Sequence, residues 1–404
     1  MKKCISHIYN HITQKMGNEE SHPNKQTYAK MFDSFSYVPI TTQRTEANYA
    51  GGFRPDVVSR PKPMMNTAYY GKWSMHVLVS ESPEPRIGQC HVYDKKTDSI
   101  VIAYGCDANG KCLNDCWALS LKTMRWRLVS KELFEPRQYS SAILMGRKMI
   151  FFGGIANGEY FAQLHYIDLD DGSVHEIKTT GDLPAARTSP AMFSHGDFLY
   201  LWSGFDGRIH NGLYRLNTND GVWQRSNESH TGISAPACCF FKGKYYIFGG
   251  SGTAMTTFDP EKCVFEPFPC TGTEPSTELL HATLIAGDEY IFLVGGESSQ
   301  KYMHIFALDV KRQWWFAFHV RPDNDTLSTA DGIVNNSGLF MLPREHSTSA
   351  VYSPAQRALV SVMGSRFHNP APIFKISIDT ALSFCHIRSD MYEMFHYMNL
   401  NDNN

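Results

Sequence analysis

The sequence predicts an all-β fold, and two observations carry this prediction. An apolar run of strand length ends in glycine six times between residues 100 and 365, at Gly105, Gly154, Gly204, Gly250, Gly296 and Gly364. Helical periodicity is poor over the same region, which argues against an all-α or doubly wound fold. A repeat of about 50 residues with four short strands per unit is typical of a β-propeller.

Each unit repeats the same elements in the same order. About a dozen residues after the glycine, a second β segment ends at a turn residue, and an aromatic side chain follows six residues later in four of the six units. These aromatic residues are Trp126, Trp223, Phe265 and Trp315. Large side chains at this position are expected to fill the widening space between neighbouring blades.

A basic residue after proline completes the repeat in four units. It stands at Arg86, Arg137, Arg187 and Arg344. As a set, the basic residue, the glycine pair and the spaced aromatic resemble the kelch family over roughly residues 83 to 388. The resemblance implies a kelch-type β-propeller, for which we predict six blades.

The sequence departs from the kelch pattern at several positions. Tyr104, Ser203 and Met363 replace the first glycine of the pair. A degenerate blade at residues 48–52 would give a propeller of seven blades instead of six. Residues 72–79 and residues 381–388 both have the character of an outer strand, and only one of these segments can complete the last blade.

The sequence also predicts the organisation around the propeller. Residues 1–65 form an N-terminal arm, with a short amphipathic helix on the stripe Ile5, Ile8, Ile12 and Met16 and a connector that contains prolines. Residues 66–390 form the propeller, and residues 391–404 form a C-terminal tail.

Composition restricts the partners and the compartment. Lysine and arginine total 38 against 40 aspartates and glutamates, so the net charge of -2 predicts no general attraction to nucleic acid. No apolar run is long enough to span a membrane. The ten cysteines form no regular framework, which predicts reduced thiols and a cytoplasmic location, with a cytoskeletal or ciliary association.

The resemblance implies a binding site where the loops converge around the central channel. The residues carried over or placed in the loops after the glycines are Arg86, Arg137, Arg187, Arg208, His210, Arg344, Arg366 and His368. Guanidinium groups around a channel mouth would favour acidic or phosphorylated peptides.

These observations predict a non-catalytic scaffold in a cytoplasmic signalling or cytoskeletal complex. No catalytic motif is recognisable, so we expect no enzyme activity, no cofactor and no metal site. Two alternatives remain open. One is a structural subunit of a cytoskeletal or axonemal assembly, tethered by the arm, and the other is a metal-dependent enzyme that uses the channel mouth.

Overall fold

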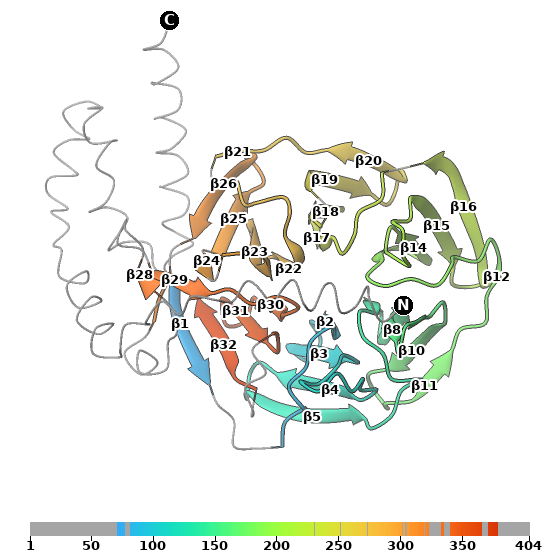
Figure 1. Ribbon diagram of the computed structural model, residues 1–404, viewed down its shortest axis with the longest axis horizontal. Helices are drawn as coiled ribbons and strands as arrows, with labels where there is room; N and C mark the ends of the chain where they lie inside the picture. Colours follow the sequence, from blue (N-terminus) through green and yellow to red (C-terminus); the bar gives the residue numbers. More distant parts are fainter. Residues whose placement is uncertain are drawn as a thin grey trace, which may run out of the picture.

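Six radial sheets surround a central channel in the computed structural model (Figure 1). The structure describes residues 71–76, 81–229, 231–250, 252–272, 274–300, 302–303, 305–318, 320–322, 333–334, 340–365 and 371–378. All regular elements in these ranges are strands, so the predicted six-bladed, all-β propeller is confirmed. Residues 48–52, the amphipathic stripe of the arm and the tail lie outside the described residues.

The first three blades each contain four antiparallel strands, counted from the channel outwards. Blade 1 consists of β2 (Cys90–Asp94), β3 (Ser99–Ala103), β4 (Cys116–Ser120) and β5 (Arg125–Ser130). Blade 2 consists of β6 (Ser141–Met145), β7 (Lys148–Phe152), β10 (Leu164–Asp168) and β11 (Val174–Glu176). Blade 3 consists of β13 (Ala191–His195), β14 (Phe198–Trp202), β15 (Gly212–Asn217) and β16 (Val222–Ser229).

The other three blades follow the same plan. Blade 4 consists of β17 (Ala237–Phe241), β18 (Lys244–Gly249), β19 (Thr253–Asp259) and β20 (Val264–Pro267). Blade 5 consists of β22 (Leu280–Ala286), β23 (Tyr290–Glu297), β25 (Ile305–Asp309) and β26 (Trp314–Phe318). Blade 6 consists of β30 (Ser349–Ser353), β31 (Ala358–Val362), β32 (Ile373–Ser377) and β1 (Gly71–His76). Short strands in the loops are β8 (Ile155–Ala156), β9 (Glu159–Tyr160), β24 (Tyr302–Met303), β28 (Ile333–Val334) and β29 (Phe340–Pro343).

The ring is closed by strand β1, which comes from the N-terminal side of the propeller. It pairs antiparallel with β32, in a register from Lys72 opposite Ser377 to His76 opposite Ile373 (Figure 1). Residues 72–76 therefore take the outer position in blade 6 that the sequence had left open. The competing segment, residues 381–388, lies outside the described residues.

Removal of β1 should open the ring. We expect a chain that begins at Glu81 to melt roughly 10 °C or more below a chain that begins at Asn66, because blade 6 loses its outer strand and exposes an unpaired edge. Thermal unfolding followed by circular dichroism measures the difference. Equal melting temperatures would show that β1 contributes nothing to closure.

Three short parallel strands join neighbouring blades at the outer circumference. These are β12 (Thr180–Gly181), β21 (Thr271–Gly272) and β27 (Val320–Pro322), which pair with β16, β26 and β1 respectively. Each follows the outer strand of one blade and pairs with the outer strand of the next. Neighbouring blades are thus also joined by backbone pairing at the outer circumference of the propeller.

The hydrophobic core consists of six clusters, one at each interface between blades. Trp223 is buried between blades 2 and 3, where its ring lies 6.5 Å from that of Phe152. Trp315 is fully buried between blades 4 and 5. The prediction that the repeat tryptophans fill the space between blades is confirmed.

The residues that replace the first glycine keep the backbone conformation that glycine favours. Tyr104, Ser203 and Met363 have φ values of 62°, 65° and 61°, in the region that side chains ordinarily avoid. Two of them reach the next blade: the Tyr104 hydroxyl lies 2.5 Å from His165 Nε2, and Ser203 Oγ accepts a hydrogen bond of 2.5 Å from the Ile233 N–H. These inter-blade bonds offset the conformational cost.

Candidate functional site: the channel mouth

The loops that precede the inner strands and those that follow the second strands lie on one face, here called the mouth face. In five blades a residue with positive φ stands two residues before the inner strand, and in blade 5 it is His281, the second residue of β22; these φ values lie between 45° and 67°, and together the residues form the mouth ring. Its members are Gly88, Tyr139, Ser189, Ala235, His281 and Ser347. All six line one cavity of about 270 Å³.

Backbone hydrogen bonds connect members of the mouth ring from blade to blade. The Tyr139 N–H donates to the Gly88 carbonyl at 2.6 Å, and the Ser189 N–H donates to the Tyr139 carbonyl at 2.8 Å. The Ser347 N–H donates to the His281 carbonyl at 3.1 Å. The positive φ turns each chain so that these groups face the neighbouring blade, which fixes the shape of the cavity.

Two aromatic side chains meet across the cavity. Tyr139 belongs to blade 2 and His281 to blade 5, which stand opposite each other in the ring, and their ring centroids lie 4.7 Å apart. The cavity lining contains serines, threonines, glutamine, histidines and apolar residues, but no aspartate, glutamate, lysine or arginine among the described residues. The site is therefore polar, uncharged and partly covered by an aromatic pair.

Three of the four repeat arginines expected at the channel mouth, Arg86, Arg137 and Arg187, are fully buried. In each, Nε donates to the carbonyl two residues earlier at 2.9 Å. Nη1 of Arg86, Arg137 and Arg187 lies 3.1, 3.5 and 2.9 Å from the carbonyls of Tyr104, Gly153 and Ser203. These guanidinium groups therefore bind the carbonyls at the ends of the glycine-ended strands, and their expected role in partner binding stays a prediction.

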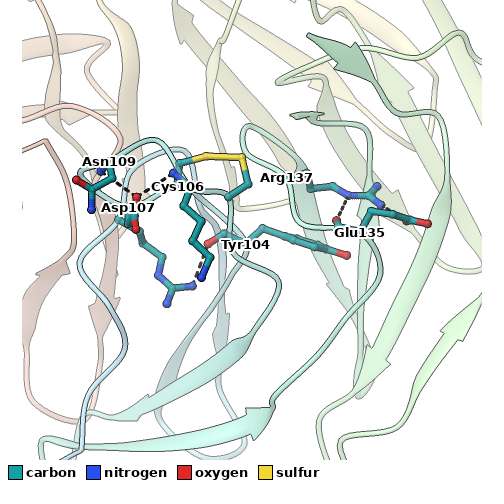
Figure 2. The surroundings of a disulfide bond; sticks show 9 residues. Tyr104, Cys106, Asp107, Asn109, Glu135 and Arg137 are labelled. Carbon is teal, nitrogen blue, oxygen red and sulfur yellow. Dashed lines mark hydrogen bonds and ion pairs between the residues drawn. A yellow bond between two sulfur atoms is a disulfide. The ribbon is translucent and has the colours of Figure 1, made fainter. Parts of the chain in front are cut away.

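The partners of these arginines differ between blades. Arg86, which is fully buried, forms an ion pair with the partly exposed Asp115, with contacts of 2.5 and 3.1 Å. Arg137 lies 2.9 Å from the Glu135 carboxylate and 4.0 Å above the Phe161 ring. Figure 2 shows Arg137 and Glu135 beside the loop that follows Tyr104.

The remaining described residues of the expected site differ in how far they are exposed to solvent. The Arg208 side chain is 80% exposed, whereas His210 is largely buried with Nε2 3.0 Å from Asp206 Oδ2. Arg344 is partly buried, and Nη1 lies 3.4 Å from the Gly296 carbonyl. Arg366 and His368 lie outside the described residues. A direct binding role for this set stays a prediction.

Sequence reasoning missed the residues that line the cavity. Tyr139, Ser189 and Ser347 stand two or three residues after the repeat arginines Arg137, Arg187 and Arg344. This short offset of two or three residues from the basic position was present in the sequence and could have identified the lining.

A disulfide lies in the mouth-face loop of blade 1. Cys106 and Cys112 are bonded, and the Asp107 carboxylate between them accepts the N–H groups of Asn109 and Lys111 at 2.9 Å each (Figure 2). The expectation of reduced thiols is wrong for this pair, which the repeat pattern gave no reason to join. The bond holds the loop in a compact form beside the channel.

Burial sets the protonation of several histidines. Burial, followed by the nearby Arg137 charge, lowers the pKa of His165 to about 3. Burial, followed by the charge of His346, lowers the pKa of His281 to about 4. These imidazoles are therefore neutral near pH 7.

The neutral His165 should make stability depend on pH. Its pKa is about 6.5 in the unfolded chain and about 3 in the fold, so its stabilisation is complete above pH 6.5 and is lost as pH falls toward 3. We expect a loss of at most about 1.4 kcal/mol per pH unit from this residue. Urea unfolding between pH 7.5 and 4.5 measures the slope.

A double variant isolates this contribution. Tyr104→Phe with His165→Phe removes the buried hydrogen bond and the titrating group together, so the slope between pH 6.5 and 4.5 should become shallower. An unchanged slope would assign the pH dependence to other groups.

Two further structural findings bear on function. Among the described residues, no group of three or more histidine, cysteine, aspartate or glutamate side chains is placed to hold a metal ion. In the same part of the chain, no helix has the length and apolar character needed to cross a bilayer.

The chain is similar to known kelch proteins. The KLHDC2/KLHL20/DRC7 Kelch-repeats domain matches residues 50–250. Tip elongation aberrant protein 1 of Schizosaccharomyces pombe is 25% identical over 260 residues, which cover 57% of this chain and 22% of that protein. Acyl-CoA-binding domain-containing protein 5 of Arabidopsis thaliana is 28% identical over 193 residues, 47% of this chain and 28% of that protein.

Kelch domain-containing protein 3 of Bos taurus is 25% identical over 198 residues, which cover 45% of this chain and 51% of that protein. The matched region thus spans between 22% and 51% of the length of these relatives. Repeat pattern, blade architecture and family match agree: the chain belongs to the kelch-repeat β-propeller family.

Proposed function

We propose that this propeller is a non-catalytic scaffold that binds a protein partner at the mouth face, within a cytoplasmic signalling or cytoskeletal complex. The observation that carries the proposal is the cavity of about 270 Å³ onto which loops of all six blades converge. Kelch propellers are generally protein-interaction modules. The name of the S. pombe relative refers to tip elongation, which favours a cytoskeletal setting.

The preference for acidic or phosphorylated peptides stays a prediction. In the described structure it depends on the exposed Arg208 and the partly buried Arg344. The tethered structural subunit is the second sequence-based function, and it depends on residues 1–65. Affinity capture with a chain that begins at Asn66 tests it, since a tether would lose all association.

A matched pair of double variants tests the mouth face. Phe205→Ser with Arg208→Glu changes an exposed aromatic residue and a nearby cation on the mouth face. Phe240→Ser with Lys242→Glu makes the same changes near the opposite face, where Phe240 is 50% exposed. We expect the first variant to lose a partner that the second retains in affinity capture, with melting temperatures unchanged. Loss only with the second variant would place binding on the opposite face.

A further inference from the structure

The charge of the mouth face differs from the sequence-based expectation. Its exposed cations are few among the described residues, namely Lys111, Lys131, Lys178 and Arg208. Carboxylates are more numerous on these loops and include Glu132, Glu159, Asp182, Glu274, Glu278 and Glu297. Because Arg86, Arg137 and Arg187 are buried and bound to carbonyls, the described part of this face has an excess of negative charge.

Two residues of the cavity wall carry buried polar atoms that have no hydrogen-bond partner among the described residues. Gln89 Nε2 donates to the Ser347 carbonyl at 2.7 Å, and this carbonyl can only accept, so the amide orientation is fixed. Gln89 Oε1 is then an acceptor, and it is buried without a hydrogen bond. The hydroxyl of Thr348, a residue only 8% exposed, is likewise buried without a partner. Both residues line the cavity.

Glu297, which has no lysine or arginine partner among the described residues, lies beside the same part of the cavity. Glu297 Oε1 is 3.5 Å from His346 Nδ1 and 4.0 Å from His281 Nε2. Burial lowers the pKa of both histidines and raises the pKa of Glu297. The histidines are neutral near pH 7 and cannot neutralise this carboxylate, so a cation placed here would gain electrostatic energy.

Gln89, Thr348 and Glu297 come from blades 1, 6 and 5, which are neighbours in the ring. The Thr283 hydroxyl donates to the Thr348 carbonyl at 2.9 Å and holds blades 5 and 6 together at this point. The aromatic pair of Tyr139 and His281 borders the same cavity. Aromatic faces attract lysine and arginine side chains.

We propose that this sector of the cavity binds a basic side chain, lysine or arginine, from a partner segment. The proposal rests on the proposed function at the mouth face and specifies the partner. Gln89 Oε1 and Thr348 Oγ1 accept the N–H groups of the incoming side chain, Glu297 supplies the opposite charge, and the aromatic pair contacts its apolar stem. The surrounding carboxylates attract basic segments, so binding should weaken as salt rises.

Short peptides of one design test this specificity. Acetylated, amidated Gly-Gly-X-Gly-Gly peptides carry arginine, lysine, citrulline or phosphoserine at X, and isothermal titration calorimetry at low salt measures their affinity for the full chain. We expect the arginine or lysine peptide to bind at least about tenfold more tightly than the citrulline peptide, which keeps the shape and lacks the charge.

Variants of the chain place the binding in this sector. Glu297→Gln should weaken the cationic peptide about tenfold, whereas Glu278→Gln, a change at an exposed carboxylate of the same face, should alter affinity less than about twofold. Thr348→Val should weaken binding without lowering the melting temperature, because the hydroxyl it removes has no partner in the free protein.

The result that overturns the inference is also specific. Tighter binding of the phosphoserine peptide would restore the sequence-based preference and leave the proposed function intact. Equal affinity of the arginine and citrulline peptides, or no binding of either cationic peptide, would remove the basic side chain as ligand. The capture experiment with the Phe205/Arg208 and Phe240/Lys242 variants decides the proposed function separately.

Discussion

Replacement of Gly153 by alanine is expected to destabilise the propeller by about 3 kcal/mol or more. Gly153 has a φ of 77°, and a Cβ at this position would lie 2.3 Å from the carbonyl oxygen of Arg187 in the next blade. Both residues lie in loops, but backbone hydrogen bonds hold them in place: the Gly154 N–H donates to the Arg187 carbonyl at 2.9 Å, and the Arg187 N–H donates to the Phe161 carbonyl at 3.2 Å. Urea unfolding at pH 7.5 measures the loss of unfolding free energy.

Gly158 provides the matched control in the same blade. It has a φ of 85°, but a Cβ there would meet no atom within 4 Å. Gly158→Ala should therefore cost only the conformational term, about 1 kcal/mol. If the two substitutions cost the same, the close approach of blades 2 and 3 at Gly153 is not what requires glycine.

Removal of the Arg86 side chain is the second change with a large expected effect. Arg86→Ala leaves the partly buried Asp115 carboxylate, 25% exposed, without its cation. We expect a loss of about 3 kcal/mol in unfolding free energy, the lower end for a buried pair. Two carbonyl contacts, to Glu84 and Tyr104, are lost as well. Chemical denaturation again measures the effect.

Two comparisons separate the buried pair from an ordinary surface ion pair. Lys96→Ala breaks an exposed pair with Asp170 and should cost about 0.5 kcal/mol or less. The double change Arg86→Met with Asp115→Leu removes both charges and should recover much of the loss. Failure of the double variant to recover stability would mean that the carbonyl contacts of Arg86, and not its charge, matter most.

The Arg86 effect should also depend on pH. Burial raises the pKa of Asp115, and the hydrogen bonds and charge of Arg86 outweigh this, so its pKa lies below the ordinary value in the native protein. The stabilisation is present above the unfolded pKa of about 3.9 and is lost as pH falls through the folded value. Without Arg86, burial dominates and Asp115 takes up a proton more readily. The difference in unfolding free energy between wild type and Arg86→Ala should therefore become smaller below pH 5.

The fold could be predicted because its main determinants are local and repeated. Each glycine-ended strand and each spaced tryptophan occupies the same place in its blade, so Trp223 and Trp315 were placed correctly between blades from spacing alone. The positive φ of Tyr104 and Ser203 also follows from their alignment with glycine. The parallel strands β12, β21 and β27 were not predicted, because segments this short have no pattern of their own.

The site was harder to predict because sequence spacing does not give the direction of a side chain. Pro-Arg at 85–86 and at 136–137 fits an exposed rim as well as a buried contact. Whether these arginine side chains are exposed or buried depends on the carbonyls of Tyr104 and Gly153, whose positions are set by the fold. Tyr139 and His281 are 142 positions apart in the sequence and meet only because blades 2 and 5 face each other across the channel.

The pairing of β1 with β32 has a consequence for biosynthesis. About 300 residues separate these strands, so at roughly 5 to 20 residues per second β1 waits roughly 15 to 60 s on the ribosome before its partner is made. During this interval both edges are open to other nascent chains or to chaperones. Completion of the ring therefore depends on the last blade. Substitutions in β32 should reduce the yield of protein in cells more than expected from their effect on the unfolding free energy of the folded protein.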